Sequence, residues 1–218
     1  MAATIACGYC HAEAGSAHFC SECRKIQPVA EGTDYFAFLG LPRKLLIDEA
    51  ELEKTFYALS RQFHPDYFMN ANDREQQASV ERSSMLNDAY RVLRDPVTRA
   101  KYLLSFHGYK EAEKKAPPDL LEEVFELNMQ IEELKGAKKM ADDDEVAEAR
   151  AALEDALRSL EDNIAKIDER LFALFEVWDR ALESSQEDQK KSALDRISEL
   201  LSHRSYVQNL VRDIKEEL

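Results

Sequence analysis

Glycine and proline are scarce in this chain, with only 6 of each among its 218 residues. Hydrophobic residues make up 44% of the sequence, a fraction typical of a folded protein and not of a disordered one. Outside the cysteine-containing beginning, no stretch of any length alternates apolar and polar residues as a β-strand would. These absences together predict a globular protein of the mainly α class.

Long apolar runs and the common catalytic motifs are missing as well. No run approaches the ~20 apolar residues of a membrane-spanning helix, and the first residues carry neither a basic secretory segment nor an Arg-rich transit segment. We therefore expect a cytoplasmic protein without a membrane partner. The sequence contains no nucleophile–base–acid set, no P-loop and no GxGxxG motif, so we do not expect the chain itself to be an enzyme.

Positive charge is in deficit, and the deficit is uneven. The net charge is −14, and residues 111–218 alone hold 16 basic against 29 acidic side chains. Binding to nucleic acid depends on Lys and Arg that neutralise phosphates, so this balance argues against a nucleic-acid partner. A zinc-ribbon nucleic-acid binder with a helical dimerisation arm remains an alternative, which a salt-dependent DNA or RNA shift would test.

Cysteine is absent after residue 23. The four cysteines form two CxxC pairs separated by nine residues: Cys7, Cys10, Cys20 and Cys23. Two such pairs can each hold one side of a tetrahedral ion, and four thiolates leave no open position for chemistry. In a reducing compartment this pattern predicts a metal site and not disulfides. We expect one structural zinc ion in a knuckle over residues 1–27; iron in a rubredoxin-like arrangement, a redox-active pair and a redox sensor are the alternatives.

The surroundings of the cysteines lead to three further expectations. His11 and His18 flank them, but four thiols suffice for one ion, so neither histidine is expected to be a ligand. Gly8 and Gly15 are expected to supply the backbone freedom of the tight turns. Residues 27–33 contain a proline and a glycine and are typical of a linker. Loss of the metal should therefore disorder the knuckle and leave the stability of the rest of the chain nearly unchanged.

The tripeptide His64-Pro65-Asp66 stands between two amphipathic stretches. In residues 48–63 the apolar side chains recur at steps of four, three and four: Leu52, Phe56, Leu59 and Phe63. A second helix is predicted over residues 74–94, and it has one face with Ala78, Arg82, Leu86, Ala89 and Leu93. Pro65 cannot continue the first helix, because it lacks an N–H and its ring clashes with the preceding turn. We expect an imidazole and a carboxylate on an exposed loop between two antiparallel helices.

Capping residues, glycine and proline predict where the neighbouring helices begin and end. Asp48 begins the helix before the tripeptide as a capping residue. A short helix is predicted over residues 34–39, with Gly40 at its end. Another begins at Asp95-Pro96, a cap followed by proline at the first helical position.

Three helical runs follow a charged junction that contains paired prolines. They cover residues 119–135, closed by Gly136, then 142–184 and 186–217. Their apolar residues repeat at alternating steps of four and three, which predicts an antiparallel three-helix bundle or hairpin. Trp178 lies on this repeat and is expected in the core. The expected domains are a tetracysteine knuckle over 1–27, a helical-hairpin domain over 34–108 and a bundle over 117–218.

The first bundle helix has more apolar residues than one stripe needs. Its core stripe consists of Leu120, Val124, Leu127, Ile131 and Leu134. A second apolar row, beside Glu122 and Glu126, consists of Leu121, Phe125 and Met129. Such an excess is typical of a surface presented to a partner. A wide core stripe explains the pattern equally well, and the residues alone leave both readings open.

The helix, His-Pro-Asp loop and second helix resemble a J-domain, the module that stimulates ATP hydrolysis by DnaK-class chaperones. Three strings of sequence are similar to one family of J-proteins, the HscB co-chaperones of iron–sulfur cluster assembly. They are Asp34-Tyr35-Phe36, Leu39-Gly40-Leu41-Pro42 and Arg99-Ala100-Lys101-Tyr102-Leu103-Leu104-Ser105-Phe106-His107-Gly108. An acidic helical bundle after the J-domain, and in animal members a tetracysteine knuckle before it, also belong to that family. The resemblance covers essentially the whole chain; it is specific at residues 34–108 and architectural after 118.

The resemblance implies a co-chaperone and not an enzyme. It would stimulate the ATPase of a DnaK/HscA-class chaperone and deliver to it an IscU-type scaffold that carries the cluster, promoting cluster transfer. Carried over by position, the chaperone contact would consist of His64, Pro65 and Asp66, with Lys54 and Arg61 adding electrostatic attraction. Tyr67 departs from the family, which usually has lysine after the tripeptide, so the positive surface beside the loop is thinner.

The family's scaffold contact lies on the first bundle helix and at an aromatic position of the last. In this sequence the corresponding residues are Leu121, Glu122, Phe125, Glu126, Met129 and Tyr206. The alternative function is a general J-domain co-chaperone that delivers unfolded clients through the same apolar surface.

Overall fold

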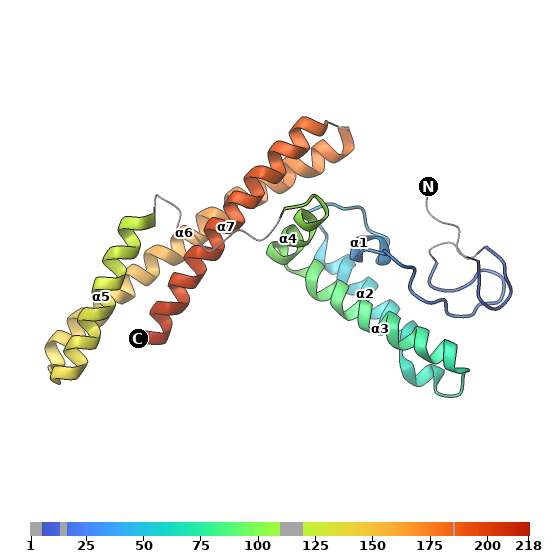
Figure 1. Cartoon of the computed structure of the whole chain (residues 1–218), viewed down its shortest axis with the longest axis horizontal. Coiled ribbons are helices and arrows are strands. Elements are labelled where there is room, and N and C mark those ends of the chain that lie inside the picture. The colour runs from blue at the N-terminus through green and yellow to red at the C-terminus, as the bar shows by residue number, and fades with distance from the viewer. Residues whose placement is uncertain (1–5, 14–16, 110–119, 185) are drawn as a thin grey trace. The chain divides into compact units, whose positions relative to one another are not determined.

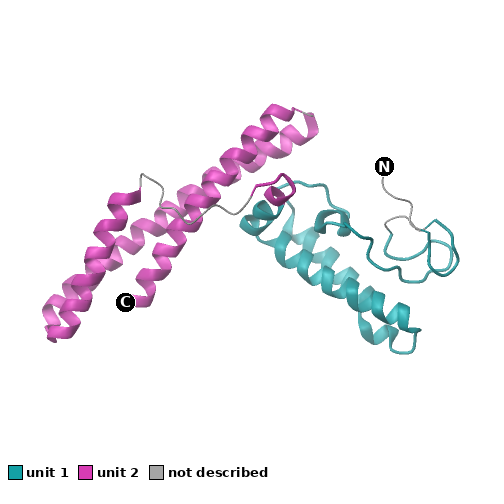
Figure 2. Ribbon diagram, in the orientation of Figure 1, with its two compact units in different colours: residues 1–102 teal, residues 103–218 magenta. Residues whose placement is uncertain are grey.

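The computed structural model describes residues 6–13, 17–109, 120–184 and 186–218. The chain forms two compact units, residues 1–102 and residues 103–218 (Figure 2). The described residues of the first unit and the start of the second contain α1 (Tyr35–Phe38), α2 (Glu49–Phe63), the 3₁₀ helix η1 (Pro65–Phe68), α3 (Asp73–Arg94) and α4 (Pro96–Phe106). The remainder of the second unit contains α5 (Leu121–Met140), α6 (Asp143–Ser184) and α7 (Glu187–Glu217) (Figure 1). The expected mainly α class is confirmed.

The hairpin of α2 and α3 begins and ends where its polar and proline residues dictate. The Asp48 carboxylate accepts hydrogen bonds from the N–H groups of Ala50 at 2.9 Å and Glu51 at 3.2 Å. These donors would otherwise be unpaired in the first turn of α2. The Asn72 side chain caps α3 in the same way, accepting from the N–H of Glu75 at 3.1 Å. Pro65 ends α2, and α3 returns beside it.

Apolar side chains of the predicted stripes fill the core of this hairpin. Leu52 and Phe63 of α2 and Leu86 and Leu93 of α3 are at most 1% exposed. Phe56 is only partly buried, and its ring stacks on Tyr90 with 4.3 Å between ring centroids. The same face of α3 also buries Arg82, a charged residue among apolar neighbours.

In the second unit α6 is the central helix, and α5 and α7 both pack along it. With 42 residues it is about 63 Å long. Trp178 is 2% exposed, so its predicted place in the core is confirmed. Ion pairs add to the apolar contacts: Arg204 binds both carboxylate oxygens of Asp168, at 2.6 and 3.0 Å. Of the helices in the described ranges, none combines the length and the apolar character that crossing a membrane requires.

One helix end differs from its prediction. Gly136 does not close the first bundle helix, because α5 continues to Met140 and ends at Ala141 in the left-handed conformation, with φ of 54°. The buried Leu134 and Ala137 on either side of the glycine hold the helix against the bundle, and this packing outweighs the weak helix propensity of glycine. The predicted helix start at residue 119 lies outside the described residues, as does most of the predicted junction.

Candidate functional sites

His64, Pro65 and Asp66, here called the HPD loop, lie on the surface at the end of α2. His64 leaves the helix with φ of −56° and ψ of 125°, and Pro65 opens η1. The side chains of His64 and Asp66 are 52% and 73% exposed. The Nδ1 atom of His64 accepts a hydrogen bond from the N–H of Asp66 at 3.3 Å, and it lies 3.5 Å from an oxygen of the Asp66 carboxylate. Both side chains are therefore available to a partner.

Side chains of α3 hydrogen-bond to the backbone just before and just after the HPD loop. The carbonyl oxygen of Phe63, the residue before the loop, accepts hydroxyl hydrogen bonds from Ser79 at 2.6 Å and Ser83 at 3.0 Å. Gln76 donates its amide N–H to the carbonyl oxygens of Met69 at 3.1 Å and Ala71 at 2.9 Å. Sequence reasoning missed these three residues. The available pattern was a pair of serines four residues apart, next to the apolar face of a helix.

The two basic residues assigned to the loop's surroundings share one exposed face of α2. Lys54 and Arg61 are seven residues apart, or about two helical turns. The ammonium of Lys54 lies 3.2 Å from the Glu51 carboxylate, which offsets part of its charge. Tyr57 lies between them on that face and is 56% exposed. Tyr67, just after the loop, is 74% exposed, so this surface is as aromatic as it is basic.

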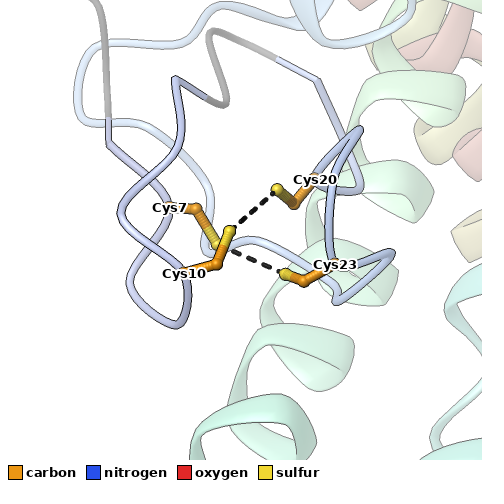
Figure 3. A group of neighbouring side chains, drawn as sticks. All are labelled: Cys7, Cys10, Cys20 and Cys23. Carbon is orange, nitrogen blue, oxygen red and sulfur yellow. Dashed lines mark hydrogen bonds between the residues drawn. The ribbon is translucent and has the colours of Figure 1, made fainter.

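The four cysteines converge at the end of the chain where the sequence predicted a metal site (Figure 3). All four Sγ atoms lie within 4.8 Å of one another. The Cys7–Cys23 and Cys10–Cys20 sulfur pairs are each 3.6 Å apart. In a tetrahedral zinc site with Zn–S bonds of about 2.3 Å, neighbouring sulfurs are roughly 3.8 Å apart. The donor set and its spacing therefore fit one tetrahedral ion.

Two turns of matching geometry present these thiols. The N–H of His11 bonds to the carbonyl of Cys7, and the N–H of Arg24 bonds to the carbonyl of Cys20, each at 3.0 Å. His11 and Arg24 have positive φ, at 60° and 59°. The expectation that Gly8 supplies the turn's backbone freedom is wrong, because the left-handed positions are the residues after each CxxC pair. A Cβ at Gly8 would meet the end of the Arg74 side chain, so the guanidinium would have to move from its present place. Gly15 lies outside the described residues.

The electrostatics of the thiols also suit a cation. Burial acts to raise the pKa of Cys7, but the backbone N–H groups of Cys10 and Tyr9 lower it to about 6. At Cys23 the N–H of Lys25 lowers the thiol pKa, yet burial and the neighbouring sulfurs outweigh it and raise the pKa to about 12. Four thiolates this close repel one another, and a divalent cation among them removes that repulsion.

The knuckle is not separated from the helices by its linker, contrary to expectation. The ammonium of Lys25 lies 3.0 Å from the Glu75 carboxylate in α3. The group of neighbouring metal-ligand atoms does not include His18, whose ring packs edge-on against Phe38 and Phe63 at 5.1 and 4.9 Å. Burial and the Arg82 guanidinium lower the pKa of His18 to about 4, so the ring is neutral and accepts a hydrogen bond. The knuckle and the hairpin belong to one compact unit.

The second apolar row of α5 lies on the surface. Leu121, Phe125 and Met129 are 56%, 66% and 50% exposed, whereas Leu127 and Leu134 on the core stripe are at most 5% exposed. Glu122 and Glu126 beside the row are exposed too. The row is therefore not part of a wide core stripe, and the partner surface stays a prediction.

Tyr206 lies on α7. An ion pair between α5 and α7 shows which part of α5 lies at the same height along the helix axes. The Lys135 ammonium on α5 lies 3.1 Å from the Glu217 carboxylate on α7, and both helices run antiparallel to α6. Tyr206 is eleven residues before Glu217, or about 16 Å along the axis. The same distance before Lys135 reaches Val124, next to Phe125. Tyr206 is half-buried at the level of the exposed row.

Comparisons with known proteins agree with this geometry. The DnaJ domain family matches residues 34–102. The mouse iron-sulfur cluster co-chaperone protein HscB is 29% identical over 213 residues, which cover 96% of this chain and 80% of the mouse protein. The crystal structure of human co-chaperone protein HscB matches with a TM-score of 0.62 and 25% identity, covering 97% of this chain and 98% of the human one. Chaperone HscB from Vibrio cholerae matches with a TM-score of 0.58 and 25% identity, over 84% of this chain and 96% of the other.

Residues 34–102 form a J-domain, and the chain is similar to HscB co-chaperones over nearly its whole length. The predicted residues form three separate groups. The HPD loop and the basic face of α2 lie together on the hairpin, the cysteines lie together in the knuckle, and the apolar row and Tyr206 lie in the second unit. No catalytic constellation was predicted for these residues.

Proposed function

We propose that this chain is a co-chaperone of iron–sulfur cluster assembly that stimulates the ATPase of a DnaK/HscA-class chaperone and delivers an IscU-type scaffold to it. The observation that carries the proposal is the exposed HPD loop at the turn of a J-domain hairpin, in a chain that is similar to HscB co-chaperones over nearly its whole length. The knuckle (1–27), the J-domain (34–108) and the bundle (117–218) then hold the metal, contact the chaperone and bind the scaffold, respectively. The chain regulates a chaperone, and ATP is hydrolysed by that partner.

On the chaperone side, His64, Pro65 and Asp66 make the contact. The two exposed polar side chains lie on a backbone that proline fixes. Because this contact surface is already rigid, little conformational freedom is lost on docking. Lys54 and Arg61 on the adjoining face attract an acidic partner surface and raise the association rate.

On the scaffold side, the contact consists of Leu121, Glu122, Phe125, Glu126, Met129 and Tyr206. Large apolar side chains in a row of one residue per turn are suited to insertion into a partner groove. The two glutamates form a charged rim, which favours a partner with basic residues beside that groove.

Cys7, Cys10, Cys20 and Cys23 bind one zinc ion in this proposal. Four thiolates fill its coordination shell, so the ion when bound supplies a structural cross-link. The free thiols lie side by side without disulfides, as suits a reducing compartment such as the cytoplasm.

Substitution of the HPD loop tests the chaperone role. His64→Gln or Asp66→Asn should abolish stimulation of the partner ATPase, while circular dichroism and the melting temperature stay unchanged, because both side chains lie on the surface. Asp73→Asn, which changes an exposed carboxylate outside the loop, is the matched control and should keep full stimulation. Full stimulation by a folded His64→Gln protein at saturating concentration would overturn the proposal.

A general J-domain co-chaperone is the second candidate, because an exposed row of leucine, phenylalanine and methionine also suits unfolded chains. Competition on the same surface separates the two. A native iron–sulfur scaffold should bind α5 and resist displacement by a denatured polypeptide. Displacement of the scaffold at equimolar denatured polypeptide would favour the general function.

A further inference from the structure

The knuckle packs against the end of the α2–α3 hairpin that carries the HPD loop. The Arg74 guanidinium donates a hydrogen bond to the carbonyl oxygen of Gly8 at 2.9 Å, and Lys25 pairs with Glu75 at 3.0 Å. Arg74 and Glu75 lie in the first turn of α3, directly after the segment that contains the loop. The metal site and the loop therefore lie on neighbouring parts of one compact unit.

The contact contains a buried arginine. Arg82 of α3 is 3% exposed, and its hydrogen bonds go to residues that precede the J-domain. Its Nε donates to the carbonyl of Gln27 at 2.5 Å, its Nη1 donates to Nδ1 of His18 at 2.5 Å, and its Nη2 donates to the carbonyl of Pro28 at 3.0 Å. A buried guanidinium whose donors lose their acceptors carries a large desolvation penalty. α3 thus depends on the knuckle and on the start of the linker to keep this charge buried in place.

The same cluster holds the residue from which the HPD loop begins. Phe63 is fully buried, and the rings of His18 and Phe19 lie 4.9 and 6.0 Å from its ring. The Arg82 guanidinium lies 5.7 Å from the centre of the Phe63 ring. The side chain of Phe63 is therefore held by the knuckle, while its carbonyl is held by serines of α3. The next residue along the chain is His64.

We propose that the knuckle positions the HPD loop, with His18, Arg82 and Phe63 as the positioning residues that link the two. This inference rests on the proposed chaperone contact and extends it, because it assigns the cysteine site to the same task. The four cysteines hold residues 20–25 in a closed turn, and the N–H of Gln27 just after it donates to the carbonyl oxygen of His18 at 3.0 Å. The turn thereby sets the place of His18 against Phe63 and Arg82. When the cysteines no longer hold the turn, Phe63 loses its packing partner and the loop samples other directions.

Hydrogen exchange of the full-length zinc-loaded protein tests the link without a chaperone. His18→Ala keeps all four cysteines, so elemental analysis should still find one zinc ion per chain. Amide exchange over residues 63–68 should become about tenfold faster in this variant, and it should also do so in the unaltered sequence after chelation. Exchange in α6 should not change. Glu22→Gln, an exposed position of the knuckle, is the matched control and should match the unaltered protein.

A conservative variant separates positioning from simple loss of structure. His18→Asn keeps an oxygen acceptor near the position of Nδ1, so it should restore part of the protection that His18→Ala loses. It also serves as the test variant if His18→Ala fails to fold. Unchanged exchange over residues 63–68 after both chelation and His18 substitution overturns the inference, and so does a response to chelation alone, because the link through His18 would then be absent.

The ATPase assay adds a functional readout. A mispositioned loop should raise the concentration of His18→Ala needed for half-maximal stimulation about tenfold and leave the maximum unchanged, since His64 itself is intact. Full stimulation by His64→Gln would overturn the proposed chaperone contact, whereas the exchange experiment would still decide whether the knuckle positions the loop. The two failures are thus distinguishable.

Discussion

The carbonyl oxygen of Phe63 accepts two hydroxyl hydrogen bonds at the point where α2 becomes the HPD loop. Ser79 is fully buried and makes the shorter of the two. Ser79→Ala should lower the free energy of unfolding by about 1 kcal/mol, the usual net contribution of such a bond, because Ser83 still satisfies the carbonyl. Urea denaturation followed by circular dichroism measures this. Ser84→Ala, at an exposed position of α3, should cost less than about 0.5 kcal/mol. Equal stabilities of the two variants would contradict the structural role of Ser79.

Arg82 shows what sequence periodicity can and cannot predict at the scale of a residue. Its spacing placed it correctly on the buried face of α3. Its partners, His18, Gln27 and Pro28, are 54 to 64 residues away, and no local pattern links residues so far apart. The HPD loop, in contrast, was predicted from adjacent residues, because a proline ends the helix before it and the apolar stripes of the two flanking helices do not include the loop.

At the scale of an element, the exposed row of α5 has energetic consequences. Leu121→Ala with Phe125→Ala should weaken scaffold binding by about 2 kcal/mol or more, as expected for large apolar anchors of an interface. Stability should hardly change, because both side chains are more than half exposed. Isothermal titration calorimetry with the scaffold and thermal melting give the two values.

The control for this prediction lies on the same helix. Met140→Ala removes a side chain that is 79% exposed at the far end of α5, outside the row, and should leave scaffold affinity unchanged. If the double variant instead keeps its affinity and loses several kcal/mol of stability, these residues contribute to folding and not to binding. Stimulation of the ATPase without scaffold should survive in every case, because the HPD loop belongs to the other unit.

Gly136 offers a second prediction at this scale. It lies inside α5, and no atom lies within 4 Å of where its Cβ would be. Gly136→Ala should therefore stabilise the second unit by about 0.5–1 kcal/mol, because glycine loses more backbone freedom on entering a helix. Thermal melting followed by circular dichroism would show this as a higher midpoint. A lower midpoint would show that the space beside Gly136 is filled.

Most helix positions were predictable from the apolar repeats. α2, α3, α6 and α7 each begin and end within about one residue of their predicted limits, since such a repeat is a local property of the chain. The end of α5 was not predictable in this way. The weak helix propensity of Gly136 suggested that the helix ends there, but the packing of Leu134 and Ala137 overrides this propensity. Exposure of the α5 row could not be predicted either, since it depends on which faces α6 and α7 cover.

At the scale of the whole molecule, the chain consists of two units rather than a string of independent modules. The linker composition of residues 27–33 suggested an independent knuckle. In the structure the linker's own carbonyl groups bind Arg82, so these residues are part of the contact. Proline and glycine reveal where a chain can bend, and they leave open whether it bends away from its neighbour or back onto it.

Metal removal tests the division into two units. Without a metal the knuckle has too small a core to keep its shape, so Arg82 and Phe63 should lose their partners and the first unit should be destabilised by about 2 kcal/mol or more. The second unit should be unaffected. Trp178 is the chain's single tryptophan and lies in the core of that unit, so its fluorescence reports the second unit. On chelation, circular dichroism should show an earlier unfolding phase while the midpoint of Trp178 fluorescence stays in place.

Replacement of the four cysteines by serine should reproduce this shift and make it insensitive to added zinc. A circular dichroism curve that chelation leaves unchanged would contradict the contact, and a fluorescence midpoint that falls with it would contradict the division.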